Sequence, residues 1–526
     1  MPRRSPPFYH PFRRSISVAH SILLLATILG CESRSSPHRL DYYFYYDPRS
    51  LDPALSTDVP TGEVITLLFD NLTQFDADGV LRPGLARSWE TDAAGLRYTF
   101  HVRTNARFHD GRPVRADDVR RSYLRALDPA TKGGRAWPLF PIAGAQAFAG
   151  GDTTSRVGIA APDDSTLVIT LAEPLNVFPK LLAMPVTAIV PVPVPVGFDQ
   201  RPVGSGPWRF VSWSHDDAVV LARNLEYWGD VPRTDTLRIR IIPEALTQAA
   251  EYESGRLSIV EIPFGETREW EASRPHELQR QPALRAMYVA INTTHGPLRD
   301  VRVRQALNHA VDVPTILQNL MGARGVLAAG SLPPSIPGYD SSRARYAYDP
   351  ALARRMLAEA GYPNGLSLKL WRSQRPEYAR LAQAFQQDLA AAGVRVEIIE
   401  RDASSARAAA RKGESDLFLT DWYGDYPDAE NFNYPLFYSK NAGPGGNLAF
   451  LADSTLDGLI LRARITGDAP EQQRLDREID ARVFDLAPWI FLWFPVDLWA
   501  ERPEIEGWKI PAIFNGQRWQ TAHHVP

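Results

Sequence analysis

The chain has 526 residues, of which 44% are hydrophobic and 23% charged, and its formal net charge is -3. A chain of this length exceeds what one hydrophobic core usually serves, so we expect two or three lobes. The composition is typical of a globular protein. The slight acidic balance argues against a nucleic-acid partner, because phosphate binding needs a basic excess.

The N-terminus predicts an export signal. Arginines precede a short apolar run at residues 21–29, too short to span a bilayer. The run ends in Ile28-Leu29-Gly30-Cys31, which resembles a bacterial lipobox, where cleavage leaves the cysteine as the new N-terminus. We therefore expect residues 1–30 to be a lipoprotein signal peptide, Cys31 to carry lipid and residues 31–37 to be a tether. The alternative is a plain secretory signal with an incidental cysteine.

Hydrophobic periodicity predicts a mixed α/β chain. Residues 62–69 and 116–127 have the spacing of amphipathic helices, and residues 95–102 alternate as a strand. Residues 190–196 alternate Pro and Val, which predicts an extended connector, because Pro lacks the N–H that a central strand needs.

The second half of the chain predicts a parallel sheet. Strands and helices alternate as strand 366–371, helix 377–392, strand 394–398, helix 404–411 and strand 417–420. This β-α-β-α-β order implies parallel strands with right-handed crossovers. The tail returns to β character in two strands, 489–494 and 498–500.

Residues 417–432 begin as the last of these parallel strands and continue as a loop rich in aromatic rings and carboxylates. The carboxyl end of a parallel strand borders a ligand crevice, and carboxylates beside rings can hold an amphipathic cation. The alternative is an acidic surface loop with core aromatics. The carboxylates Asp421, Asp425, Asp428 and Glu430 lack the alternating spacing of a Ca²⁺ loop, so we expect no metal.

The sequence gives no support for a catalytic site. Gly204-Ser205-Gly206 lacks the complete Gly-x-Ser-x-Gly elbow, and neither His-Glu-x-x-His nor a Walker A segment is present. We therefore expect neither an enzyme nor a cofactor.

Several short segments together carry a family resemblance. They are residues 51–53, 68–72, 82–89, 98–103, 108–111 and 116–119. In this order they resemble the extracytoplasmic solute-binding proteins of peptide ABC transporters, the oligopeptide- and dipeptide-binding family (solute-binding family 5). The resemblance runs from about Leu51 to the final strands.

The resemblance implies an α/β fold of the periplasmic-binding-protein type (class II), with two α/β lobes, a hinge and an extra N-terminal α/β subdomain. Lobe I would comprise 38–69, 192–285 and 493–526, the extra subdomain 70–191, and lobe II 286–492. The expected function is capture of peptides between closing lobes for delivery to an ABC permease. The protein would be a lipid-anchored monomer on the periplasmic side of a bacterial membrane.

The resemblance also implies site residues. The segment Trp422-Tyr423-Gly424-Asp425-Tyr426 resembles the family's Trp-x-x-Asp-Tyr, in which the Asp pairs with the peptide's α-ammonium and the Trp lines the site. We therefore predict Asp425 and Trp422 as ligand contacts, with Tyr423, Tyr426 and Asp421 as further candidates. Trp422 has the alternative of a core residue with a locally bonded N–H.

Two departures from the family's pattern bear on the ligand. Leu419 stands where some relatives have an Arg that meets the ligand carboxylate, and Asp421 stands where they have a small neutral residue. Asp421 either suits a more cationic ligand or is a solvated or Arg-paired side chain. Arg372 and Arg375 are alternative carboxylate partners. A non-peptide solute, such as a metal chelate, opine, sugar or haem-like ligand, stays open.

Overall fold

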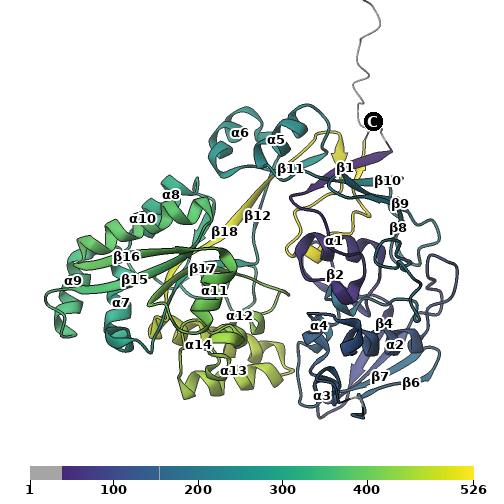
Figure 1. Ribbon diagram of the computed structural model, residues 1–526, viewed down its shortest axis with the longest axis horizontal. Helices are drawn as coiled ribbons and strands as arrows, with labels where there is room; N and C mark the ends of the chain where they lie inside the picture. The colour runs from purple at the N-terminus through teal and green to yellow at the C-terminus, as the bar shows by residue number, and fades with distance from the viewer. Residues whose placement is uncertain (1–37, 153, 526) are drawn as a thin grey trace, which may run out of the picture.

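The computed structural model describes residues 38–152 and 154–525, so the predicted signal peptide, the tether and Cys31 lie outside the described residues. Figure 1 shows two bodies side by side, with the long strand β18 (Trp489–Glu501) running from one toward the other. Both bodies mix helices and strands, which confirms the predicted α/β fold class. Within the described ranges, no helix is long and apolar enough to cross a bilayer.

Lobe I is built on a four-stranded sheet. Its strand order is β1 (Arg39–Phe44), β10 (Thr236–Ile241), β9 (Ala218–Arg223) and β8 (Trp208–Ser214). Strand β1 runs parallel to β10 and the other pairs are antiparallel. Helix α1 (Val59–Leu68) packs Val64 against this sheet's buried side chains, among them Leu40 and Trp208.

The carboxylate of Asp70, directly beyond α1, ties distant parts of lobe I together. It accepts hydrogen bonds from Arg518 (2.9 Å), Ser205 (3.0 Å), Tyr227 (3.0 Å) and Trp228 (2.9 Å). A buried carboxylate is tolerated when it is paired and fully hydrogen-bonded. The C-terminal segment is therefore joined to α1 and to the loops around β8 and β9.

The extra subdomain holds an antiparallel sheet of its own. Its strand order is β4 (Ala86–Thr91), β5 (Arg97–Val102), β7 (Thr166–Thr170) and β6 (Ile159–Asp163). Helix α2 (Ala116–Leu127) covers β6 and β7 with the bounds that the sequence predicts. The short helix α4 (Phe178–Leu181) lies on the side that faces lobe II.

Lobe II contains the predicted β-α-β-α-β unit. Its elements are β15 (Leu366–Ser373), α10 (Pro376–Ala391), β16 (Val394–Arg401), α11 (Ala403–Arg411) and β17 (Leu417–Tyr423). Strand β15 lies between β16 and β17 and is parallel to both, which confirms the predicted parallel arrangement.

Helices cover both faces of this sheet. One face packs on α10 together with α7 (Val301–His309), α8 (Val313–Leu320) and α9 (Pro350–Glu359). The other packs on α11 together with α12 (Glu430–Phe437), α13 (Ser454–Ile465) and α14 (Ala469–Leu486). Burial on both faces explains why β17 is an apolar run and not an alternating one.

The prediction of two separate strands in the tail was wrong, because β18 is a single strand of 13 residues. Its first half pairs with β13 (Arg285–Ile291) and β14 (Gly325–Leu327), and its second half with β11 (Ile259–Glu261) and β12 (Leu278–Pro282).

Pro495 does not break β18, because proline lacks only the backbone N–H and keeps its carbonyl as a hydrogen-bond acceptor. Its carbonyl still accepts the Ala283 N–H at 2.9 Å. The β12–β13 segment and β18 thus form an antiparallel connection between the two bodies. The predicted lobe boundary 492/493 lies inside β18, and the residue limits of the lobes stay a prediction.

Candidate functional site

The alternation of β17 sorts the predicted site residues onto two faces of the sheet. Leu417 and Leu419, both 0% exposed, pack in the layer of helices α7–α10, whereas Phe418 packs in the opposite layer. Successive strand side chains point to opposite faces of the sheet. Asp421 therefore lies on the same face as Leu419, and Trp422 lies on the same face as Phe418. Leu419, at the position of the family's Arg, is therefore part of the core and does not reach a ligand.

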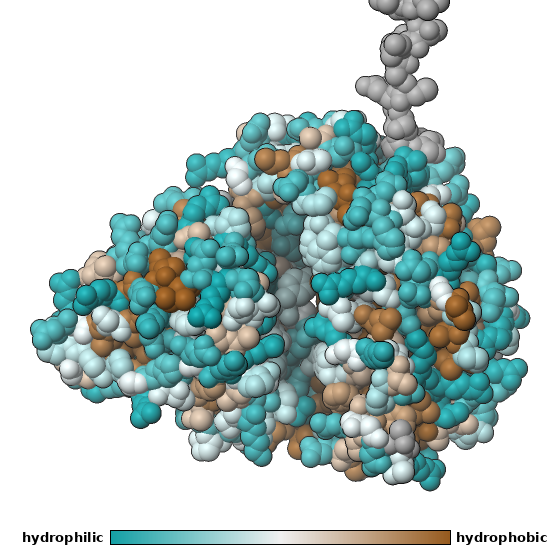
Figure 2. All heavy atoms as spheres, viewed as in Figure 1, coloured by the Kyte–Doolittle hydropathy of each residue, from teal (hydrophilic) through white to brown (hydrophobic). Residues whose placement is uncertain are grey.

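A cavity of about 830 Å³ lies between the extra subdomain and lobe II. From the extra subdomain it is lined by Trp137, Phe140, Leu175 and Leu181, among others, and from lobe II by Arg411, Trp422, Asp425, Tyr426, Tyr434 and Arg464, among others. Figure 2 shows the furrow between the two bodies. Apolar walls with a few polar groups are typical of a small-ligand site.

Asp425 lies in the loop between β17 and α12, and its own N–H donates to Asn431 Oδ1 at 2.8 Å, which fixes the loop. Its carboxylate has no hydrogen bond or ion pair with any described residue. Burial raises the pKa of Asp425, and the charge of Arg135 opposes this only in part. The cavity therefore contains a desolvated anion without a counter-ion, the arrangement that an ammonium group would complete.

Trp422 and Tyr426 lie beside Asp425 but differ in their polar groups. The Trp422 Nε1 is buried and has no acceptor in the described part of the chain, so the local bond expected of a core tryptophan is missing. The Tyr426 hydroxyl donates to Glu430, which also accepts from Arg464 at 2.8 Å. The Nε1 of Trp422 is closed off from the cavity and the Tyr426 hydroxyl is occupied, so both residues serve as aromatic walls.

Asp421 has internal partners. It accepts from Arg285 Nε and from the Tyr378 hydroxyl, both at 2.8 Å, and Arg375 lies 3.7 Å away. Burial raises the pKa of Asp421, but these cations and the hydroxyl outweigh it and hold the pKa below its usual range. Asp421 does not line the cavity, which agrees with the expected alternative of an Arg-paired side chain.

Tyr423 also lies outside this cavity. Its side chain is 42% exposed and lines a second, smaller cavity against lobe I. The structure thus brings Asp425, Trp422 and Tyr426 together in the cavity between the bodies and places Asp421 and Tyr423 elsewhere.

The arginines proposed as carboxylate partners are not at the cavity. Arg372 is bonded to Glu400 and to the Ser373 carbonyl, and Arg375 lies beside Asp421. Arg411, the last residue of α11, lines the cavity instead and forms no ion pair with the described residues. A lone arginine at a helix C-terminus gives no sequence signal of this role, because such residues commonly complement the helix dipole.

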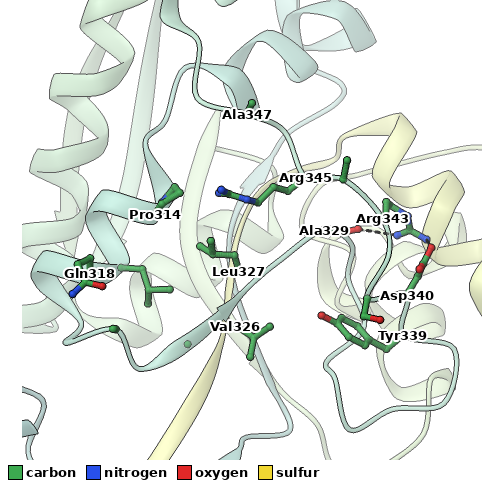
Figure 3. Close-up of a pocket in the computed structure, with 15 residues that line it drawn as sticks. Pro314, Gln318, Val326, Leu327, Ala329, Tyr339, Asp340, Arg343, Arg345 and Ala347 are labelled. Carbon is green, nitrogen blue, oxygen red and sulfur yellow. Dashed lines mark hydrogen bonds and ion pairs between the residues drawn. The ribbon is translucent and has the colours of Figure 1, made fainter.

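Lobe II also carries a hollow of about 840 Å³, lined by α8, β14 and the loop 339–347. Figure 3 shows that Arg343 is turned toward the Ala329 carbonyl, to which it donates at 2.8 Å, while it also pairs with Asp480. None of the predicted site residues lines this hollow. Across the described ranges, no group of three or more His, Cys, Asp or Glu side chains is placed to hold a metal ion.

Comparisons with known proteins identify the family. The family of bacterial extracellular solute-binding proteins, family 5 (middle) matches residues 80–444. Heme-binding protein A of Haemophilus influenzae is 31% identical over 469 residues, covering 84% of each chain. Glutathione-binding protein GsiB of Pectobacterium atrosepticum is 32% identical over 459 residues, covering 84% of this chain and 86% of that protein.

A solved structure shows the same likeness. The ABC transporter-associated periplasmic binding protein DppA from Helicobacter pylori, in complex with the peptide STSA, superposes with a TM-score of 0.75 at 26% identity. The alignment covers 92% of this chain and 98% of that one. The chain therefore belongs to family 5 of the bacterial extracellular solute-binding proteins, which serve ABC transporters, and it is a binding protein and not an enzyme.

Proposed function

We propose that this protein captures peptides in the cavity between the extra subdomain and lobe II, with the peptide's α-ammonium on Asp425. The observation that carries the proposal is the desolvated Asp425 carboxylate, which has no partner in the described chain. A charge-assisted hydrogen bond to an ammonium would satisfy it. The DppA relative, whose structure contains a peptide, supports the same ligand class.

The other open groups of the cavity suit the rest of a peptide. The ring of Trp422 can pack against the peptide's apolar atoms, and Arg411 can receive a carboxylate. An extended peptide offers its terminal charges whatever its side chains, so affinity does not require a fixed sequence.

The two-body architecture supports a role in delivering the peptide. A ligand in this cavity contacts both the extra subdomain and lobe II, so it favours the arrangement in which both line the cavity. A membrane permease would then recognise the closed form. Lipid on Cys31 would hold the protein, as a monomer, on the periplasmic side of a bacterial membrane.

A non-peptide solute is the second candidate, since one relative is named for heme. Haem carries two propionates, and a carboxylate placed near the unpaired Asp425 would be repelled. Glutathione, named for the other relative, is itself a peptide with a free ammonium. The unpaired Asp425 therefore favours a ligand with an ammonium group, and Arg411 can pair with a carboxylate of either kind of ligand.

A thermal-shift panel tests the ligand class. The mature protein would be mixed with di- to pentapeptides, glutathione, hemin, an opine, a sugar and a metal chelate. A ligand present at 100 times its Kd stabilises the folded state by about 2.7 kcal/mol, which a melting curve resolves. We expect peptides with free N-termini to raise the melting temperature. The proposal is wrong if every peptide fails while another class succeeds.

A further inference from the structure

A second cavity, of about 100 Å³, lies where Tyr423 of lobe II meets lobe I and the C-terminal half of β18. Four of its walls are the rings of Tyr42, Trp499, Trp508 and Trp519. Their contacts form a closed circuit, with centroids 6.2 Å apart for Tyr42–Trp499, 5.7 Å for Trp499–Trp508, 6.3 Å for Trp508–Trp519 and 4.8 Å for Trp519–Tyr42. We refer to it as the aromatic cavity.

Glu63 projects from α1 to line the aromatic cavity and is the only charged residue of that helix. Its carboxylate has neither a hydrogen bond nor an ion pair with any residue that the structure describes. Burial alone raises the pKa of Glu63 to about 8. The helix thus places an acid among aromatic rings without a cation to accompany it.

Asp497 of β18 is the second carboxylate of the aromatic cavity. It also has no hydrogen bond or ion pair within the described chain, but the charges of Arg285 and Arg324 partly offset the effect of burial, which raises its pKa. Glu63 is therefore the carboxyl of the aromatic cavity whose pKa no protein cation lowers.

Packing explains neither the Glu63 carboxyl nor the Nε1 of Trp508. A buried acid without a partner lowers stability, and an apolar residue on α1 would fill the same wall without that loss. Trp508 is only 4% exposed, and its Nε1 also has no acceptor among residues 38–152 and 154–525. A cation over aromatic faces and beside a carboxylate gains both a cation–π attraction and an ion pair.

We propose that the aromatic cavity is a subsite for the cationic side chain of a lysine or arginine in the bound peptide, held by Glu63 and the surrounding rings. This inference rests on the peptide-binding function proposed above. The aromatic cavity has room for a cationic group larger than water, because its volume of about 100 Å³ is several times the roughly 10–15 Å³ that one water molecule needs by the same kind of measure.

One ligand can reach both cavities. Tyr423 borders the aromatic cavity and Asp425, two residues later, borders the larger one. Two residues of extended chain span at most about 7 Å. A peptide with its α-ammonium on Asp425 can therefore extend a side chain toward Glu63.

A lysine scan tests the subsite. The ligands would be tetrapeptides in which lysine, ε-N-acetyl-lysine or norleucine occupies each position in turn. Calorimetry would measure the affinity of each peptide for the wild type, Glu63→Gln and Glu90→Gln. Glu90 is an exposed residue on β4 of the extra subdomain and serves as the matched control. We expect lysine at one position to bind about tenfold more tightly than norleucine to the wild type and to Glu90→Gln.

Glu63→Gln should abolish this preference and leave the affinity for the norleucine peptides unchanged. The wild type should bind acetyl-lysine peptides no more tightly than norleucine peptides. This comparison tests the charge of the lysine without any change in the protein. The inference is overturned if norleucine peptides bind and no lysine gains affinity, or if Glu63→Gln keeps the gain. If no peptide binds at all, the proposed function fails, and this inference fails with it.

Discussion

Asp425 and Glu63 each line a cavity of the cleft and have neither a side-chain hydrogen bond nor an ion pair with any described residue. Asp421 is held by Arg285, Asp428 by Lys180 and Glu430 by Arg464. An unpaired buried charge lowers stability, so a protein that keeps one gains something from it elsewhere. Ligand binding is the gain that we infer at both positions.

Sequence reasoning identified one of these two residues. Asp425 lies in a segment whose residue order resembles a known family, so its role could be predicted before its surroundings were known. Glu63 carries a weaker signal, a single charge in the apolar helix α1, which is also compatible with a solvated face. Only the fold shows that its neighbours are the rings of β1, β18 and the C-terminal segment, hundreds of residues apart in the chain.

Asp476 gives a prediction on stability. This residue of α14 is 3% exposed, and burial, with Asp428 and Glu430 nearby, raises its pKa to about 8 although Asn433 and Lys180 oppose this. A carboxyl whose folded-state pKa exceeds its unfolded value of about 3.9 stabilises the fold fully below that value, and this stability is lost as pH rises toward 8.

We therefore expect Asp476→Asn to raise the free energy of unfolding by about 1 kcal/mol or more at pH 8 and by less at pH 5. Urea denaturation at the two pH values measures both numbers. An equal change at pH 5 and pH 8 would show that Asp476 does not titrate in this range.

At the scale of elements, contacts at the rim of the cleft join the extra subdomain to lobe II. Lys180 of α4 pairs with Asp428 in the loop before α12. Asn176 donates through Nδ2 to the carbonyls of Ala463 (3.0 Å) and Thr466 (2.8 Å) at the end of α13. The two bodies are therefore tied together at this edge as well as along β18.

A double-mutant cycle measures the strength of this tie. Asp428 is 5% exposed, so removing Lys180 leaves a buried carboxylate without its cation. We expect Lys180→Met to lower the free energy of unfolding by about 3 kcal/mol, and the double variant Lys180→Met/Asp428→Asn to be more stable than Lys180→Met alone. Strictly additive effects would mean that the pair does not act as a unit.

Local patterns were sufficient for the parallel strands and for helix α2, because hydrophobic periodicity acts over a few residues. They were insufficient for β18, where Pro495 gave a false break. They also could not show that Trp137 and Phe140, from a short turn of the extra subdomain, form the wall opposite Asp425. Such a wall depends on how two bodies meet, which no local pattern encodes.

At the scale of the whole molecule, the proposed site belongs to neither body alone. The larger cavity takes walls from the extra subdomain and lobe II, and the aromatic cavity takes walls from lobe I, β18 and lobe II. A ligand that fills them is therefore expected to stabilise one relative placement of the two bodies. The position of Asp425 in this shared space makes its charge the central element of the account.

The most direct test is calorimetry of one tripeptide, with a free or an acetylated N-terminus, against the wild type, Asp425→Asn and the exposed control Asp217→Asn. We predict that the wild type and the control prefer the free N-terminus by about 100-fold, as expected for a desolvated charge pair, and that Asp425→Asn removes this preference. If Asp425→Asn binds the free peptide as tightly as the wild type does, Asp425 is not the ammonium anchor and the account is contradicted.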